Sequence, residues 1–516
     1  MNDQNIGTQI RKEERNMNNV LEFLYEACKR QPNKIALSDA DSEITYRQLV
    51  CEAESVGTAL VQQIGAKRLP IAVLVDRNLE SICCFLGVVE SGNFYVPIST
   101  EQPRERLEAI ITQMQPAAII ATCDFSLLSE MGEAGIPVFE YQQLNKTVSD
   151  QALLETIRAN SLDIDPLFAI CTSGSTGTPK GVVKSHRSVL EFVPVFARTF
   201  GFNEDERFAN QAPFDFDVSA KDIYTTLYCC ASLFIIPKVC FSMPKKLATA
   251  LDEREITTLI WAVSALCVVA GLKAFKHTKP RAIRKVMFSG EVMPIKHLNT
   301  WREYYPDAQF VNLYGPTEST GNCLFYIVDR DFSEGETLPL GIPFDNVEVM
   351  VLDEGKPIER GGMGEVFIRG ACVALGYYRD PTRTAASFVQ NPLNEVFPEL
   401  VYRTGDLVRI NEDGELFFAG RKDFQIKHMG HRIELEELET HMNALDGITR
   451  SCCVFDEKHG KIVAFYEGDL ESTEIIQQMG KKLPKYMIPN RFERVEQIPI
   501  SKNGKIDRAK LREALN

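Results

Sequence analysis

Residues 172–181 read Thr-Ser-Gly-Ser-Thr-Gly-Thr-Pro-Lys-Gly, a loop that holds three glycines, five hydroxyl side chains and one lysine. The apolar segments at 166–171 and 182–183 flank it, and each predicts a strand. Glycine-rich backbone exposes its N–H groups and approaches a ligand without a Cβ in the way, and the hydroxyls here add further donors. The loop therefore predicts a binding site for a polyphosphate, such as that of a nucleoside triphosphate.

Two other interpretations fit the loop less well. A flexible Ser/Gly linker has a similar composition, but it does not lie between apolar strands or end in Pro-Lys-Gly. The P-loop of common NTPases requires G-x-x-x-x-G-K-[ST]. In this chain Gly174 and Gly177 are too close together, and Lys180 is followed by Gly181. The sequence thus indicates a phosphate-binding loop of another kind.

The apolar pattern predicts an α/β fold of about two to four packed subdomains, since 516 residues are too many for one core. Strands alternate with helices, which favours a parallel or mixed sheet. After about residue 340, short strands separated by glycine turns predict a smaller, mainly β subdomain. The expected strands are 69–75, 94–98, 117–121, 258–261, 285–288, 310–312, 347–352, 364–369, 407–410 and 416–419, and the expected helices include 80–90 and 103–115.

Composition excludes several classes of function. A net charge of −14 disfavours a general nucleic-acid or membrane-surface role. No apolar run reaches about 18 residues, so no transmembrane helix is expected. The 14 cysteines include no C-x-x-C, and three adjacent pairs in apolar runs are expected to be small buried side chains. With no signal peptide, we expect a cytoplasmic protein.

A second motif covers residues 312–320, where a strand is expected to end at Leu313 and Gly-Pro follows. Ligands bind at such carboxyl ends of strands in open α/β sheets. Thr317 can donate to a phosphate oxygen, and Glu318 is a hard oxygen ligand suited to Mg²⁺ on a triphosphate. The alternative is a plain turn whose carboxylate caps a following helix.

Three later segments carry weaker signals. Asp406 follows an expected tight turn, where a carboxylate can hold both hydroxyls of a ribose, although Thr-Gly-Asp is also a common turn. The polar segment 420–434 indicates either an interdomain hinge or a charged surface linker. Near the end, an Asn-Gly turn presents Lys505 at a loop tip, as either a functional or a solvated lysine.

These five motifs, in this order over about residues 45–508, resemble the adenylate-forming enzymes: acyl-CoA synthetases, luciferases and adenylation domains of nonribosomal peptide synthetases. Shorter segments at 44–46, 95–98, 376–377 and 483–489 match as well, while Leu375 departs from the Arg common there. The resemblance implies a large N-terminal domain of α/β subdomains with a small β subdomain, and a small mobile α+β C-terminal domain. We expect a flexible lead at 1–19, the core at 20–422 with the β subdomain at about 340–422, and the mobile domain at 423–516.

The resemblance also implies roles for individual residues, with ATP and Mg²⁺ as cofactors. Glu318 would hold the metal, Asp423 would be the hinge, and residues 427–430 would face the pantetheine tunnel. Lys505 would bond the reacting carboxylate and the α-phosphate as charge develops. The nucleotide would be bound by Thr172, Ser173, Gly174, Ser175, Thr176, Gly177, Lys180, Gly290, Glu291, Asn312, Tyr314, Gly315, Thr317, Asp406 and Arg421. These segments are expected to share one cleft.

The segment 216–219 resembles the place where amino-acid-activating members carry an Asp that pairs with the substrate's α-ammonium. The alternative is that Asp215 or Asp217 is simply an acidic residue in a turn. An inward-facing Lys221 needs an acidic or polar substrate side chain, because an unpaired buried ammonium is costly. If Lys221 points outward, the pocket is small and suits alanine or serine. The family pattern places the pocket at Asp217, Val218, Lys221, Ser264, Met287, Ser289, Leu313, Gly321 and Asn322.

Segments 216–224, 289–294 and 423–437 look especially like D-alanine–carrier-protein ligases. We therefore expect a freestanding enzyme that activates a small or polar amino acid and transfers it to a phosphopantetheinylated carrier protein in trans, with no nucleic-acid or membrane partner. The rival enzyme is an acyl- or aryl-CoA ligase that uses coenzyme A. A catalytically silent, ATP-sensing or scaffold protein on the same fold is the alternative from another class.

Overall fold

The computed structural model describes residues 17–65, 67–123, 135–174, 178–276, 278–500 and 506–515. Internal contacts divide the chain into two compact units. Unit 1 comprises residues 1–100, 116–170 and 182–419, and unit 2 comprises 101–115, 171–181 and 420–516. The first 16 residues of the expected lead lie outside the described part of the chain. The expected boundary at 422/423 stays a prediction.

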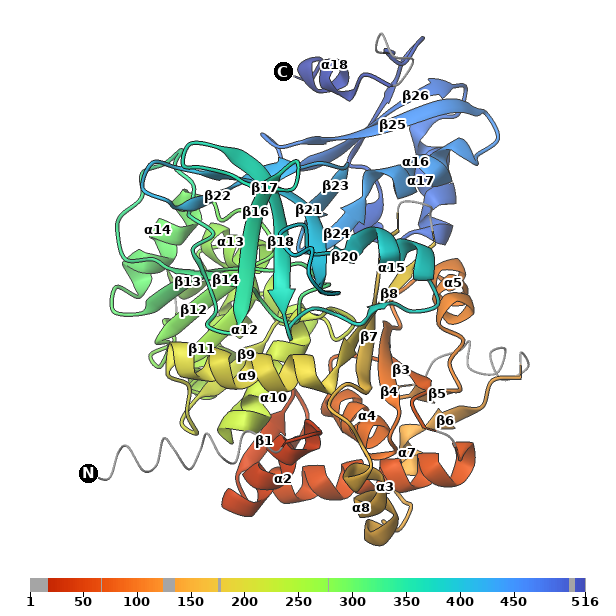
Figure 1. Ribbon diagram of the computed structural model, residues 1–516, viewed down its shortest axis with the longest axis vertical. Helices are drawn as coiled ribbons and strands as arrows, with labels where there is room; N and C mark the ends of the chain where they lie inside the picture. The colour runs from red at the N-terminus through yellow and green to blue at the C-terminus, as the bar shows by residue number, and fades with distance from the viewer. Residues whose placement is uncertain are drawn as a thin grey trace. The chain divides into compact units, whose positions relative to one another are not determined.

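A seven-stranded sheet has the order β19-β8-β7-β4-β3-β5-β6 (Figure 1). Its central strands pair in parallel, and β19 joins β8 antiparallel. Every residue of β3 is buried, as expected for an apolar strand covered on both faces. The strands predicted at 69–75, 94–98 and 117–121 are confirmed within a residue or two. The bounds are β3 Pro70–Val75, β4 Phe94–Ser99, β5 Ala118–Ala121, β6 Val138–Glu140, β7 Pro166–Thr172, β8 Lys180–Ser185 and β19 Gly376–Tyr377.

Two helices beside this sheet, α3 (Tyr46–Ile64) and α4 (Leu79–Glu90), begin at side-chain caps. Thr45 and Gln48 form a capping box, and Asn78 accepts a hydrogen bond from the backbone of Ser81 over 3.1 Å. The helices approach closely at two glycines: a Cβ on Gly57 would lie 2.5 Å from that of Glu90, and one on Gly87 would lie 2.4 Å from Val56. The helix predicted at 80–90 is confirmed.

A nine-stranded sheet in unit 1 has the order β15-β14-β13-β12-β11-β9-β10-β1-β2. In this order, neighbouring strands from β13 through β12, β11, β9 and β10 to β1 pair in parallel. Strands β2, β14 and β15 pair antiparallel with their neighbours. The strands predicted at 258–261, 285–288 and 310–312 are confirmed and are slightly longer. The bounds are β1 Ile35–Ser38, β2 Glu43–Thr45, β9 Arg207–Asn210, β10 Ser232–Ile235, β11 Thr258–Ala262, β12 Lys285–Ser289, β13 Gln309–Tyr314, β14 Leu324–Ile327 and β15 Ile342–Pro343.

The remaining helices of unit 1 pack around its sheets (Figure 1). Helix α9 contributes Phe192, Phe196 and Phe200 to an aromatic cluster that Phe344 completes. These rings belong to the largest buried core. The bounds are α2 Leu21–Arg30, α7 Tyr141–Leu144, α8 Gln151–Ala159, α9 His186–Phe200, α10 Val218–Cys229, α11 Lys238–Ser242, α12 Pro244–Glu253, α13 Val263–Gly271, η1 Ala274–Lys276, α14 Ile295–Tyr304 and α15 Pro381–Ser387.

The smaller β subdomain is a six-stranded sheet with the path β17-β16-β18-β21-β20 and β22 beside β21 (Figure 1). The strands predicted at 347–352, 364–369 and 416–419 are confirmed. The strand predicted at 407–410 is confirmed as the last part of β21, which begins at Leu400. The tight turn expected before Asp406 is wrong, because those residues belong to the same strand. Between the Phe367–Arg403 and Glu365–Leu407 pairs the register shifts, and Gly405 takes φ +76°. The bounds are β16 Val347–Asp353, β17 Lys356–Pro357, β18 Met363–Gly370, β20 Phe388–Gln390, β21 Leu400–Ile410 and β22 Leu416–Arg421.

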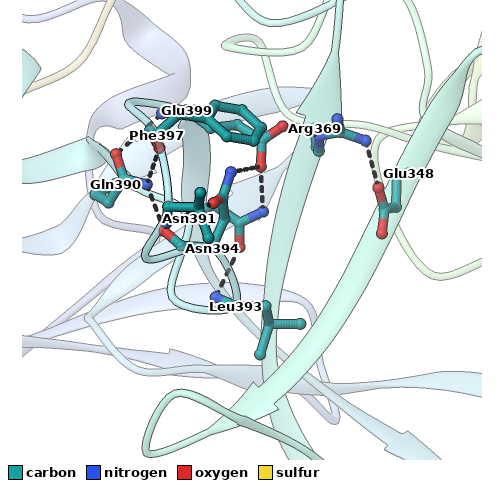
Figure 2. Close-up of polar contacts among 9 residues, drawn as sticks. Glu348, Arg369, Gln390, Asn391, Leu393, Asn394, Phe397 and Glu399 are labelled. Atoms are coloured by element: carbon teal, nitrogen blue, oxygen red, sulfur yellow. Dashed lines mark hydrogen bonds and ion pairs between the residues drawn. The ribbon is translucent and has the colours of Figure 1, made fainter.

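The loop between β20 and β21 is organised by Glu399 (Figure 2). Its carboxylate accepts hydrogen bonds from Arg369 over 2.6 Å, Asn391 over 2.7 Å and Asn394 over 3.0 Å. Arg369 also donates to Glu348 over 2.8 Å. The loop is therefore tied to the neighbouring strands β18 and β16 by charged hydrogen bonds.

Unit 2 contains a three-stranded sheet, a β23–β24 hairpin and the helices that cover them. Its cores gather apolar residues of α16, β25, β26 and α17. Helix α5, predicted at 103–115, belongs to this unit, where Arg106 forms a buried ion pair with Glu437. The bounds are α5 Arg104–Met114, β23 Gln425–His428, β24 His431–Glu434, α16 Leu435–Asn443, β25 Ile448–Asp456, β26 Lys461–Gly468, α17 Ser472–Lys482, η2 Lys485–Met487, β27 Arg491–Arg494 and α18 Arg508–Glu513.

Candidate functional site

A cavity in unit 1 is lined by residues of β7, β8, α9, α10 and the segment after β13. Its polar lining consists of Lys184, Asp217, Lys221 and Thr320, and the other lining residues are Phe168, Val189, Phe192, Val193, Ala220 and Gly321. A small set of converging polar groups on an apolar wall is typical of a small-molecule site. We call this space the lysine cavity.

Asp217 precedes the first residue of α10, where a carboxylate commonly caps a helix. Its side chain makes no capping hydrogen bond, and it lines the lysine cavity instead. The interpretation of Asp217 as a turn acid that serves the local backbone is therefore weakened. An α-ammonium is a chemically suitable partner for a carboxylate in this position.

Lys221 faces inward, which settles the alternative that the sequence left open. Its side chain is 3% exposed, lines the lysine cavity, and donates from Nζ to Oδ1 of Asn322 over 2.6 Å. Burial lowers the pKa of Lys221, while the neighbouring carboxylates of Asp222 and Asp217 act in the opposite direction. Asn322 thus positions this ammonium by accepting a hydrogen bond from it.

Lys184 is a cavity residue that sequence reasoning missed. It lies in β8, is fully buried, and its Nζ has no hydrogen-bond partner among the described residues. Burial lowers its pKa to about 8, against the attraction of Asp217 and Glu318. The available signal in the sequence was a lysine directly after the apolar pair at 182–183, where strand character was expected.

Gly321 also lines the cavity, and its position requires a glycine. It has φ +66°, and a Cβ there would lie 2.3 Å from the ring of Phe192. The aromatic ring therefore packs directly on the backbone and shapes one side of the cavity.

Besides Asn322, five residues of the expected pocket do not line this cavity. Met287 and Leu313 pack in the core on β12 and β13, and Ser289 ends β12 opposite Leu313 in register. Ser264 lies in the first turn of α13, and Val218 is the first residue of α10. Their role in substrate binding stays a prediction.

The segment after β13 positions the expected nucleotide residues of unit 1. Glu318 is fully buried and accepts a hydrogen bond from the Tyr377 hydroxyl over 2.7 Å. The element that follows is strand β14, so the alternative that Glu318 caps a helix is wrong. Its carboxylate suits Mg²⁺ on a triphosphate, which takes one or two protein carboxylates and completes its shell with phosphate and water oxygens.

Asp406 lies in the bulged part of β21 and is 2% exposed. The Tyr314 hydroxyl donates to its carboxylate, and Thr404 Oγ1 accepts from its backbone N–H over 2.9 Å. Two expected nucleotide residues, Tyr314 and Asp406, are thus in direct contact although they are 92 positions apart.

Each of the other expected nucleotide residues of unit 1 has its own local environment in the structure. Asn312 donates to the backbone of Pro339 over 2.8 Å. A Cβ on Gly315 would lie 2.8 Å from Cα of Asn322, so the backbones touch there. Gly290 has φ +99°, Glu291 follows it, and Thr317 is half-buried before Glu318. Their nucleotide contacts stay predictions.

In unit 2 the described part of the Ser/Thr/Gly loop contacts the β23–β24 hairpin. Ser173 Oγ donates to the backbone oxygen of Arg432 over 2.9 Å, and Lys180 Nζ lies 3.8 Å from Glu434. Thr172 and Gly174 are also described, whereas Ser175, Thr176 and Gly177 lie outside the described residues. The expected polyphosphate site is not tested by these contacts.

The expected hinge residue Asp423 forms a two-pronged ion pair with Arg421, at 2.6 Å from Nε and 2.7 Å from Nη2. Burial by itself raises the pKa of Asp423, but Arg421 brings it below its ordinary value. Lys505 lies outside the described residues, and its flanking residues Ile500 and Ile506 pair antiparallel. The hinge and catalytic roles remain predictions.

Two kinds of feature are absent from the described part of the chain. Within it, no helix is long and apolar enough to cross a membrane. Within the same residues, no group of three or more His, Cys, Asp or Glu side chains could hold a metal ion. The six cysteines of the adjacent pairs are all buried, as expected.

Comparison with known proteins identifies relatives of the whole chain. Residues 24–378 match the family model described as AMP-binding enzyme. The D-alanine–D-alanyl carrier protein ligase of Staphylococcus aureus (strain MRSA252) is 30% identical over 97% of this chain and 100% of its own length. Bacitracin synthase 1 of Bacillus licheniformis is 30% identical over 95% of this chain, which spans only 9% of that relative.

A solved structure supports the same assignment. It is described as holo-PA1221, an NRPS protein containing adenylation and PCP domains bound to a vinylsulfonamide inhibitor. The match has a TM-score of 0.83 and 26% identity, and covers 96% of this chain and 84% of that one. The mixed α/β fold with large N-terminal subdomains and a small C-terminal α+β domain is thereby confirmed.

Proposed function

Since the chain belongs to the AMP-binding enzyme family and is an AMP-forming ligase, we propose that it activates an amino acid and transfers it to a carrier protein. In the first step a carboxylate oxygen of the amino acid attacks the α-phosphorus of ATP, and pyrophosphate leaves. In the second step the sulfur of a phosphopantetheine thiol attacks the carbonyl carbon, the thiol loses its proton, and AMP leaves.

The observation that carries an amino acid substrate is the carboxylate of Asp217 in the lysine cavity. It lines a buried space and does not cap the helix that it precedes. An α-ammonium would form a charge-assisted hydrogen bond with this carboxylate, whereas a plain carboxylic acid has no cation to offer it. The full-length similarity to D-alanine–D-alanyl carrier protein ligases supports the same substrate class.

The roles of the nucleotide-binding residues are part of the proposal. Asp406 holds the ribose hydroxyls, and Glu318 binds the Mg²⁺ that accompanies ATP. Mg²⁺ supplies charge neutralisation at the phosphates when bound. The Ser/Thr/Gly loop with Lys180 binds the triphosphate, and Lys505 stabilises the charge that develops at the reacting carboxylate and α-phosphate. Catalysis is then chiefly positioning and charge stabilisation.

The acceptor is proposed to be the phosphopantetheine of a carrier protein supplied in trans, because relatives of this chain are carrier-protein ligases or belong to proteins with a carrier domain. The test has two stages. ATP–pyrophosphate exchange is measured with a panel of L- and D-amino acids, aryl acids and fatty acids. Acylation of a phosphopantetheinylated carrier protein is then compared with acylation of free coenzyme A.

We expect exchange with an amino acid and acylation of the carrier protein. Asp217→Ala should abolish exchange with that amino acid, while Asp215→Ala, a neighbouring acid outside the cavity lining, should retain it. Efficient use of coenzyme A together with a harmless Asp217→Ala would instead identify an acyl- or aryl-CoA ligase. No exchange with any acid would contradict the enzymatic proposal.

A further inference from the structure

The lysine cavity contains two buried polar atoms that the described protein leaves without hydrogen-bond partners: Nζ of Lys184 and Oγ1 of Thr320. Lys184 is fully buried and Thr320 is 4% exposed. An ammonium carries three donors and a hydroxyl one, and leaving such groups unpaired is costly. A ligand that accepts hydrogen bonds at this place would remove that cost.

Lys221 adds donors of the same kind to the cavity. Asn322 Oδ1 accepts one of its three protons over 2.6 Å, and no second hydrogen bond from Lys221 is found among the described residues. Lys184 and Lys221 thus bring two buried ammonium groups to the wall of the cavity. This chemistry selects an anion over a neutral acceptor.

Three carboxylates lie near these lysines, but only Asp217 lines the cavity. Asp222 accepts a hydrogen bond from Asn210 over 2.9 Å, and Glu318 accepts one from Tyr377. When the α-ammonium of a substrate takes Asp217, the two lysines lose the counter-charge that shares their cavity. Lys221 then keeps Asp222 and Lys184 keeps Glu318 as a charged neighbour, but no carboxylate lines the cavity beside them, and an anionic group of the substrate would replace it.

We propose that the amino acid activated by this enzyme carries an anionic side chain, which Lys184, Lys221 and Thr320 bind in the lysine cavity. This inference rests on the proposed function and specifies its substrate class. Aspartate and glutamate are the simplest occupants, with a carboxylate that accepts from both ammonium groups. The apolar residues Phe168, Val189 and Phe192 contact the methylene part of the side chain.

The test is ATP–pyrophosphate exchange by the full-length protein with matched pairs of acids and amides in both chiralities: aspartate against asparagine, and glutamate against glutamine. We expect kcat/KM for one acid to exceed that for its amide by at least about 30-fold, because the amide leaves a buried charge unpaired. Alanine and serine complete the panel as small neutral substrates.

Two variants, Lys184→Met and Lys221→Met, remove each ammonium while keeping an unbranched side chain. Each should lower kcat/KM for the acid by about 30-fold or more and raise the ratio of amide to acid. The control is Lys285→Met on β12, which removes a partly buried lysine that pairs with Glu206 outside the cavity. It should leave the amide-to-acid ratio unchanged.

The outcomes separate this inference from the proposed function. Exchange with alanine, serine or an amide in preference to the acids would overturn the inference and leave amino acid activation intact. An equal fall for acid and amide in the Lys184 and Lys221 variants would also overturn it, since a purely structural role acts on both. Exchange with no amino acid would overturn the proposed function itself.

Discussion

The hydroxyl of Tyr377 donates a hydrogen bond to Oε1 of Glu318 over 2.7 Å, and both side chains are buried. Strand β19 therefore orients the carboxylate that is proposed to bind Mg²⁺, from 59 positions away in the sequence. This hydrogen bond fixes the orientation of the carboxylate before any metal binds.

Tyr377→Phe tests this orientation. Losing one hydrogen bond to a buried charged group costs about 1.5–3 kcal/mol. We expect a higher KM for Mg·ATP in pyrophosphate exchange and a smaller effect on the KM for the amino acid. Tyr326→Phe is the matched control, because Tyr326 donates to Asp329 over 2.8 Å near the surface. An unchanged KM for Mg·ATP in Tyr377→Phe would contradict a metal role for Glu318.

Asp406→Ala tests recognition of the ribose. The wild-type enzyme should prefer ATP over 2′-deoxy-ATP, because the deoxy sugar cannot satisfy both carboxylate oxygens. The variant should raise the KM for ATP roughly 10- to 100-fold and lose this preference, consistent with one hydrogen bond to a charged group. Asp413→Ala, an exposed acid in the turn after β21, should behave as wild type. Retained discrimination in Asp406→Ala would exclude the ribose role.

Lys184 makes the stability of the ligand-free protein depend on pH in a defined direction. Burial lowers its pKa from 10.5 to about 8, so between these values the unfolded chain binds a proton that the folded chain lacks. Its contribution to the free energy of unfolding therefore becomes more favourable as pH rises through 8 toward 10.5. Below pH 8 the buried charge costs about 3 kcal/mol.

Lys184→Met should accordingly stabilise the ligand-free protein at pH 7, and the gain over wild type should shrink between pH 8 and 10. Urea denaturation at several pH values measures it. Lys285→Met should instead destabilise, because it leaves the buried carboxylate of Glu206 without its cation. A Lys184→Met variant that loses stability at pH 7 would show that this ammonium is already paired in the folded protein.

The ion pair between Arg106 and Glu437 anchors α5 to α16 within unit 2, and both side chains are buried. Arg106→Met leaves Glu437 charged and unpaired, and should cost about 3–5 kcal/mol. The double variant Arg106→Met, Glu437→Leu should recover much of this loss. Lys482→Met, which removes an exposed partner of Glu105, should cost less than about 1 kcal/mol. Equal losses for the single and double variants would refute the pairing argument.

Lys505→Ala should slow pyrophosphate exchange by at least about 100-fold without changing the urea denaturation midpoint, because a charge aimed at the transition state is lost. Lys502→Ala, in the same terminal segment, is the matched control and should remain active. Unchanged exchange in Lys505→Ala would refute the proposed catalytic role.

The strands and helices that follow simple apolar periodicity were predictable from sequence. Strands β3, β4 and β12 and helices α4 and α5 lie where the pattern places them, since continuous apolar runs and amphipathic stretches have few alternative conformations. Strand β21 was predicted too short, because a glycine with positive φ is typical of a turn. Pairing with β18 absorbs Gly405 as a bulge instead.

The motifs also identified the family, because their residues and order are read directly from the chain. The sequence alone left two questions open: whether Lys221 points inward, and whether Lys184 is buried beside the same cavity. A lysine in a strand or helix usually reaches solvent, so its burial depends on which elements cover it. Here α9, α10 and the segment after β13 close over β8, and that packing places both ammonium groups beside Asp217.

Sequence by itself thus determined the alternation of strands and helices and the order of the motifs, because both follow from local residue chemistry, and the resemblance that those motifs carry implied the class of reaction. Tertiary structure alone decided the charge balance of the lysine cavity. That balance depends on distances between residues as far apart as Lys184 and Thr320, and on the loss of solvent around them, which no local pattern specifies.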